Sequence, residues 1–148
     1  MPIPALDENG FLPLGVHECT LEEVARRFGA FQDSDRRPRL FGQFRLFLAE
    51  ARASGLVLAV IIDGSFVTSK PAPGDIDLVL VVRPDYDYLA DISPGQYNVV
   101  TRSRVRRHFG FDVLLARDGQ EEYGAAIRFY QQVREDPDRF KGILRITL

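Results

Sequence analysis

The sequence predicts an α/β fold from two observations: three short apolar runs, and segments of helical periodicity around them. The runs LVLAVIID, DIDLVLVV and FGFDVLLA are rich in Val, Ile and Leu and predict three strands, the first of which suits a position buried on both faces. Before and between these runs, apolar residues recur every three or four positions, as they do on one face of a helix. We therefore expect a short mixed β-sheet packed against helices.

Length and composition indicate one globular domain over residues 1–148. Of its 148 residues, 45% are hydrophobic and 27% are charged, and the formal net charge is −2. No apolar run approaches the roughly 20 residues that cross a bilayer, and the N-terminus lacks the pattern of a signal peptide. We expect a cytoplasmic protein without a membrane partner. The single cysteine, Cys19, excludes an internal disulfide and a cysteine-rich zinc site.

The first half of the chain is expected to contain an extended arm, two helices and one strand. Residues 1–16 are rich in Pro and Gly and predict the arm. Thr20 and Glu23 have the spacing of a capping box, which predicts a helix that runs to about Phe28. Apolar residues at helical spacing predict a second helix over 38–55, with the glycine as its stop. The apolar run LVLAVIID then forms the first buried strand.

In the second half, strands and helices alternate. The expected elements, in order, are a loop with one helical turn at its start (64–74), a strand (75–82), a short helix opened by Pro84 and Asp85 and closed by the sequence SPG, a basic helix (96–108), a strand (109–116), a helix (121–134) and a terminal strand or packed tail (141–148).

Two aspartates, Asp75 and Asp77, lie at the start of the second predicted strand. Alternate strand residues share a face, so both carboxylates project the same way, while Ile76 and Leu78 point into the core. Two neighbouring carboxylates repel, and partial burial raises the cost. Magnesium is the ion that a few carboxylates and substrate phosphates hold together, and two such ions promote attack on a phosphate. Asp112, in the third apolar run, is the expected third carboxylate.

The pair Gly64-Ser65, which follows the first strand, predicts a phosphate site. Glycine has no Cβ, so a ligand can approach the backbone closely. If Ser65 begins a helical turn, its hydroxyl and the free N–H groups of that turn would attract a triphosphate. Lys70, in the same loop, could add a positive charge.

This pattern resembles the DNA polymerase β-type nucleotidyltransferase superfamily. The match consists of Gly64-Ser65 after Ile62-Asp63, then Asp75-Ile76-Asp77-Leu78, then Asp112 on a later strand, and it covers about 56–116. The flanks also resemble those of small bacterial nucleotidyltransferase-like proteins of unassigned function. The sequence departs from the pattern in two ways: it has Asp63 where the family usually has an apolar or small residue, and with 148 residues it is expected to lack a large acceptor-binding domain.

The resemblance implies a minimal nucleotidyltransferase fold and a magnesium-dependent enzyme. Such an enzyme moves a nucleoside monophosphate from a nucleoside triphosphate, ATP among them, to a hydroxyl of RNA, a protein or a small molecule. It implies that Gly64 and Ser65 hold the nucleotide phosphates. Asp75 and Asp77 would bind two Mg²⁺ ions, and Asp112 would serve the catalytic ion and the attacking hydroxyl.

Two other functions remain open. Small domains of this type include inactive regulators and members of toxin–antitoxin pairs, so the chain could instead bind a partner protein. A third, weaker hypothesis is nucleic-acid binding through the basic segment TRSRVRRH, in which Arg102 and Arg106 share a helix face. His17 and His108 are expected to have structural roles, and the sequence assigns neither the acceptor nor the base preference.

Overall fold

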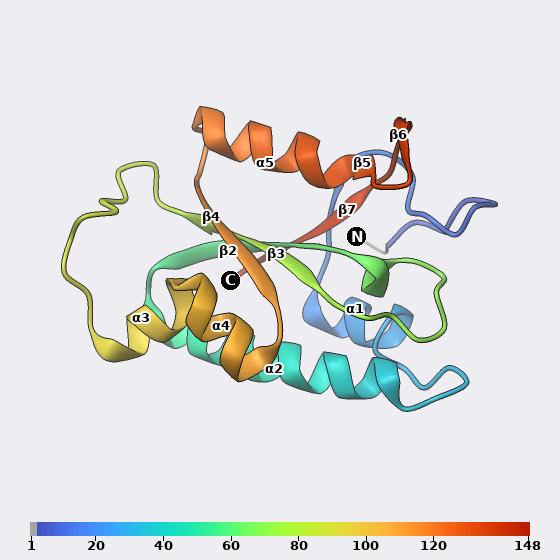
Figure 1. The fold of residues 1–148 in the computed structure, drawn as a ribbon, viewed down its shortest axis with the longest axis horizontal. Helices are drawn as coiled ribbons and strands as arrows, with labels where there is room; N and C mark the ends of the chain where they lie inside the picture. The colour runs from blue at the N-terminus through green and yellow to red at the C-terminus, as the bar shows by residue number, and fades with distance from the viewer. Residues whose placement is uncertain (1–2) are drawn as a thin grey trace.

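The computed structural model, which describes residues 3–148, is an α/β fold with helices on both faces of a mixed sheet (Figure 1). The helices are α1 (Leu21–Arg27), α2 (Arg36–Ser54), α3 (Pro94–Val100), α4 (Arg102–Phe109) and α5 (Glu121–Gln131), with a 3₁₀ turn η1 (Ser65–Val67). The strands are β1 (Val16–Glu18), β2 (Val57–Asp63), β3 (Asp77–Val82), β4 (Asp112–Arg117), β5 (Gln132–Val133), β6 (Asp136–Phe140) and β7 (Ile143–Thr147).

The main sheet has five strands in the order β1-β7-β2-β3-β4. Strand β2 is antiparallel to both of its neighbours, β7 and β3, whereas β3 and β4 are parallel. A parallel pair needs a crossover connection, and helices α3 and α4 lie in that connection. Strands β5 and β6 form a separate two-stranded ribbon after α5.

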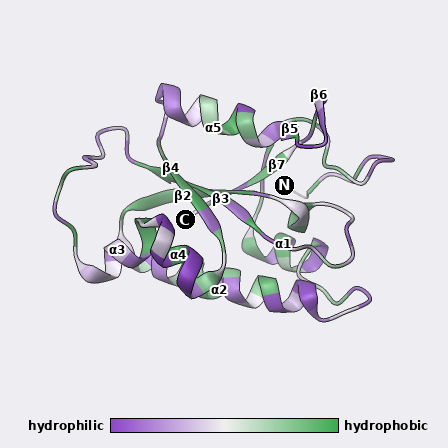
Figure 2. Cartoon of the chain, viewed as in Figure 1, coloured by the Kyte–Doolittle hydropathy of each residue, from purple (hydrophilic) through white to green (hydrophobic). Residues whose placement is uncertain are grey.

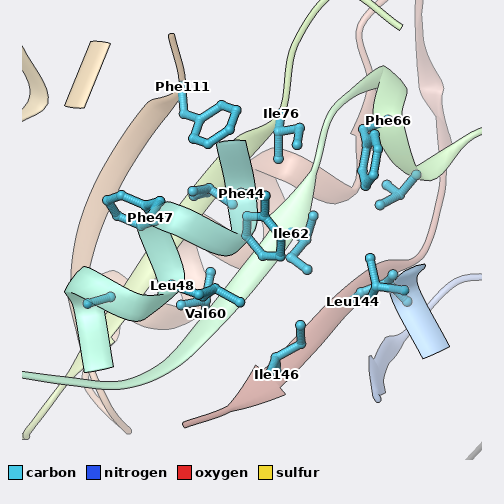
Figure 3. Close-up of a cluster of buried hydrophobic side chains, with 14 of the residues drawn as sticks. Phe44, Phe47, Leu48, Val60, Ile62, Phe66, Ile76, Phe111, Leu144 and Ile146 are labelled. Carbon is cyan, nitrogen blue, oxygen red and sulfur yellow. The ribbon is translucent and has the colours of Figure 1, made fainter. Parts of the chain in front are cut away.

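The larger core lies between the sheet and helices α1 to α4. Strand β2 sends Val60 and Ile62 into this core, where they meet α2 (Figure 3). The ring of Phe111 lies edge-on to those of Phe44 and Phe47, with centroids 6.5 and 6.4 Å apart. These rings and aliphatic side chains explain why the apolar positions of α2 recur at helical spacing.

The smaller core lies on the opposite face of the sheet, under α5. Ala59 and Ile61 of β2 and Val79 of β3 pack there against Ile127 and Tyr130 of α5. The central strands are therefore apolar on both faces, and Figure 2 shows them as the most hydrophobic part of the chain. Among the described helices, none is long and apolar enough to cross a membrane.

Most of the expected elements are confirmed, with small differences in their bounds. Helix α1 begins with the predicted capping box, in which Thr20 and Glu23 bond each other's backbone, and α2 ends at Gly55 in a left-handed conformation. The helical turn at Ser65 is present as η1. The C-terminal segment is a strand, β7, and the predicted arm has no regular structure from residue 3 until β1 begins; its first two residues lie outside the described part of the chain.

The region 83–108 differs from the expectation in two places. The helix predicted to open at Pro84 and Asp85 is wrong: the segment forms turns, and the Asp87 carboxylate accepts a hydrogen bond from the backbone N–H of Leu89 at 2.9 Å. Such local bonds compete with helix formation. The basic helix begins earlier, at a capping box on Ser93, and breaks into α3 and α4 at Thr101, whose backbone is extended.

The end of the last helix is also different. Helix α5 stops at Gln131, and Val133, which was expected on its buried side, lies in strand β5. Val133 is nevertheless buried. A β-branched residue suits a strand as well as the helix face on which it was predicted.

Candidate functional site

Three aspartates meet side by side at one end of the sheet. Asp63 ends β2, Asp77 begins β3 and Asp112 begins β4, and the strand register pairs Asp63 with Asp77 and Asp77 with Asp112. Neighbouring strands lie about 4.8 Å apart. Asp63 lies two residues after Ile61, and Asp77 lies two residues before Val79; both apolar residues pack under α5. Alternate strand residues share a face, and Asp112 is in register with Asp77, so all three carboxylates lie on the face of the sheet that α5 covers. Asp75 lies just before β3, outside the strand.

Asp77 is the central carboxylate of this cluster. Partial burial, together with the negative charges of Asp75, Asp63 and Asp112, raises the pKa of Asp77 from its ordinary value of 3.8 to about 6. Within residues 3–148, its carboxylate makes no ion pair and no hydrogen bond with another side chain. Asp77 is therefore an acid group without a counter-charge at contact distance, between two other acid groups.

Two arginines of α4 contact the neighbours of Asp77. Arg102 Nη2 donates to Asp112 Oδ1 at 2.8 Å, and Arg106 Nη1 lies 3.4 Å from Asp75 Oδ2. The two arginines are one helical turn apart and share a face, as the sequence predicted. Their side chains remain 63% and 58% exposed, so the ion pairs lie at the edge of the site.

Asp63 has a buried partner that sequence reasoning missed. The ammonium of Lys141, in the segment between β6 and β7, contacts its carboxylate, and the two residues are 8% and 4% exposed. Burial raises the pKa of Asp63, and the positive charge of Lys141 opposes that rise. An Asp at the end of an apolar strand indicates that some cation must compensate it. The sequence does not indicate that the cation lies 78 residues further along the chain.

Tyr130 of α5 is a second residue of this region that the sequence did not assign to the site. It is 8% exposed and packs in the smaller core. Burial, and then the negative charges of Asp77, Asp112 and Asp63, raise the pKa of its phenol to about 12. The C-terminal part of α5 therefore covers the carboxylates with a neutral side chain.

The Gly64-Ser65 pair lies directly against the segment that carries Asp75, just before β3, and Asp77, the first residue of β3. Gly64 has a positive φ of 91°, and a Cβ built there would lie 3.2 Å from both Asp75 O and Asp77 N. Only glycine tolerates both that backbone conformation and that proximity. The Ser65 hydroxyl accepts a hydrogen bond from the N–H of Gly74 at 3.1 Å, which ties the two ends of the loop together.

Lys70 lies in the middle of that loop, on its exposed side. In the described part of the chain, its ammonium forms no ion pair, and the structure does not bring it to the carboxylates. Its backbone carbonyl, in contrast, accepts a hydrogen bond from Arg37 at 2.6 Å. Of the six predicted site residues, the structure therefore gathers Gly64, Ser65, Asp75, Asp77 and Asp112, while Lys70 remains at the periphery.

Two arginines at the start of α2 hold this loop, the buried Arg37 from inside and the exposed Arg36 from the surface. The guanidinium of Arg37, only 2% exposed, donates to the carbonyls of Phe28, Phe66, Thr68 and Lys70 at 2.6 to 3.1 Å. Arg36 donates to the carbonyls of Pro73 and Gly74 at 2.8 and 2.7 Å. The conformation of the loop between η1 and β3 thus depends on cations that no local pattern in the loop reveals.

The donor chemistry of the cluster fits a hard divalent cation, because it consists of carboxylate oxygens on neighbouring strands. As the side chains stand, however, no three Asp, Glu, His or Cys residues of the described chain are grouped closely enough to hold an ion. The two α4 arginines contact Asp75 and Asp112 in this arrangement. A shared cation would require these side chains to reorient around Asp77.

The remaining candidates have structural surroundings. His17 Nε2 lies 2.7 Å from the carbonyl oxygen of Pro13, and His108 is exposed on α4. Cys19 is buried, and burial raises the pKa of its thiol to about 12. None of these residues is part of the carboxylate cluster.

The fold and the site together define an α/β protein whose mixed sheet ends in a carboxylate cluster flanked by arginines. The chain belongs to the DUF6932 family, a family of unknown function, whose model matches residues 4–147. No curated protein and no solved structure matches the chain significantly.

Proposed function

We propose that the protein is a metal-dependent nucleotidyltransferase with a minimal nucleotidyltransferase fold. The observation that carries the proposal is the register of Asp77 with Asp112 on parallel strands, with Gly64 packed against the Asp75–Asp77 segment. A site of this kind needs two carboxylates at the entry of one strand, a third from the neighbouring strand, and a glycine turn beside them. This chain supplies each part at one end of the sheet.

In the proposed reaction, a hydroxyl oxygen of the acceptor attacks the α-phosphorus of a nucleoside triphosphate. The bond to the β-phosphate breaks, pyrophosphate leaves, and the hydroxyl proton passes to water or to a carboxylate of the cluster. Bound Mg²⁺ would neutralise the phosphates and the carboxylates at the same time. Asp75 and Asp77 would hold the ions, Asp112 would lie on the acceptor side, and Ser65 would face the phosphates.

The test replaces the central carboxylate. Asp77→Asn keeps the shape of the side chain and removes its charge, so we expect the variant to lose Mg²⁺-dependent binding of nucleoside triphosphates and label transfer to components of a cell extract. Asp91→Asn, at an exposed position away from the cluster, is the matched control. If calorimetry with ATP, CTP, GTP and UTP shows no Mg²⁺-dependent binding to the unmodified protein, the proposal is wrong.

A second candidate function is favoured by one specific observation: Arg102 and Arg106 form ion pairs with Asp112 and Asp75. A nucleotidyltransferase-like module that binds a partner protein, as in a toxin–antitoxin pair, needs no catalytic ion. It would co-purify with that partner, and Asp77→Asn would leave the complex intact. Loss of the complex in this variant would count against the module.

A further inference from the structure

The ion pairs of α4 have a feature that a purely structural role does not require. Both arginines contact carboxylates that flank Asp77, and neither contacts Asp77 itself. Both side chains are more than half exposed, at 63% and 58%. Exposed ion pairs contribute only about 0–1 kcal/mol to stability, so little free energy is lost when they separate.

A divalent cation that binds this cluster competes with the arginines. A guanidinium in contact with a ligand carboxylate repels the cation and engages one of the oxygens that would bind it. Once displaced, a long and exposed arginine side chain on α4 remains within reach of whatever the cation carries. Arginine binds phosphate through parallel N–H···O bonds, which makes polyphosphate its most favourable alternative partner there.

We infer that Arg102 and Arg106 exchange partners: without a divalent cation they neutralise Asp112 and Asp75, and with it they bind the phosphates of the nucleotide. This inference rests on the proposed function, because it assigns the polyphosphate of the substrate to two named side chains. The arginines then weaken binding of the bare cation and strengthen binding of the cation with its nucleotide.

The experiment compares the double variant Arg102→Gln/Arg106→Gln with the unmodified protein. Binding of Mn²⁺ alone is measured from the loss of the free-ion signal in electron paramagnetic resonance, and binding of tripolyphosphate in saturating Mn²⁺ is measured by calorimetry. We expect the double variant to bind Mn²⁺ about tenfold more tightly and tripolyphosphate about tenfold or more weakly, the scale of one to two charge-assisted hydrogen bonds. Neither measurement depends on catalytic activity.

The control removes the same charge from the same helix. Arg104→Gln/Arg107→Gln leaves the carboxylate contacts in place: Arg104 contacts Asn98 and the ring of Tyr97, and Arg107 makes no side-chain ion pair within residues 3–148. We expect this control to change both affinities less than threefold. Thermal melting of all variants establishes that each is folded.

The outcomes separate the inference from the proposed function. Opposite shifts of the two affinities, absent in the control, support the exchange. Equal affinities in the double variant and the unmodified protein, or tighter Mn²⁺ binding with unchanged tripolyphosphate binding, overturn the exchange and leave the transferase proposal standing. If neither protein binds Mn²⁺ or tripolyphosphate, both the exchange and the proposed function are wrong.

Discussion

The start of α2 and the face of α4 both place arginines beside the site, but Arg37 of α2 and the two α4 arginines, Arg102 and Arg106, have different surroundings. Arg37 is 2% exposed and donates only to backbone carbonyls. Arg102 and Arg106 are more than half exposed and contact carboxylates.

A buried cation bonded to backbone is fixed in place, because its partners have no other donor. An exposed cation on a carboxylate can leave, because water replaces each partner. The difference separates an arginine that builds the site from arginines that can take part in its chemistry.

The largest expected effect comes from Arg37. Replacing it in Arg37→Met keeps much of the volume but leaves four carbonyls without their donor, so we expect the free energy of unfolding to fall by about 4 kcal/mol. Urea unfolding measures the loss. Arg36→Met, which removes bonds to two carbonyls nearer the surface, is the control and should cost about 1 kcal/mol. Equal losses of stability in the two variants would show that burial of the cation does not determine its contribution to stability.

Replacing Lys141 tests whether burial or the type of acceptor determines how much a cationic side chain contributes to stability. It is buried like Arg37, but its partner is a carboxylate, that of Asp63. In Lys141→Met the carboxylate loses its counter-charge, and we expect the protein to lose about 3 kcal/mol of stability at neutral pH. The double variant Asp63→Leu/Lys141→Met should recover most of that loss, as chemical denaturation can show. A loss of under 1 kcal/mol in the single variant would mean that acceptor type matters more than burial.

Asp77 supplies a pH dependence, because its pKa is raised to about 6 in the folded protein. Between about pH 4 and pH 6, the folded state carries more protons on Asp77 than the unfolded chain, so this group lowers stability as the pH rises. Without added metal, we expect Asp77→Asn to be more stable than the unmodified protein by about 1 kcal/mol near pH 7, a figure reduced for the partial exposure of the carboxyl. This difference in stability between the variant and the unmodified protein should disappear as the pH falls through 6.

The comparison variant for this pH effect is Asp91→Asn. The Asp91 side chain is exposed, so the stability of this variant should equal that of the unmodified protein across the whole pH range. Thermal melting at a series of pH values measures both. A gap for Asp77→Asn that widens toward acid pH would contradict the assigned charge crowding.

The smallest effect is expected for the α4 arginines. Arg102→Gln/Arg106→Gln should change the free energy of unfolding by less than about 1 kcal/mol, and high salt should reduce the difference further. Denaturant titrations at low and high salt measure this. A loss comparable to that of Arg37→Met would mean that the α4 arginines hold the fold, and the contrast between the two regions would disappear.

Local chemistry in the sequence was sufficient for many elements of the fold. Thr20 and Glu23 predicted the start of α1, Gly55 the end of α2, and the three apolar runs the strands β2, β3 and β4. The errors lie where local signals compete. The SPG sequence was interpreted as the end of a helix, whereas Ser93 caps the start of α3. The β-branched run before Thr101 interrupts a helix that basic composition alone favours.

By itself, the sequence determined the α/β class, the strands β2, β3 and β4, and the placement of Asp77 and Asp112 on two of these strands with Asp75 beside Asp77, because periodicity and turn residues act over a few neighbouring positions. Only the tertiary structure decided which cations surround the site. They are Lys141 against Asp63, Arg37 beneath the loop, and the α4 arginines on Asp75 and Asp112. These partners are distant along the chain, and strand register and helix packing bring them together. Charge compensation acts through space, so no local pattern can specify which cation meets which carboxylate.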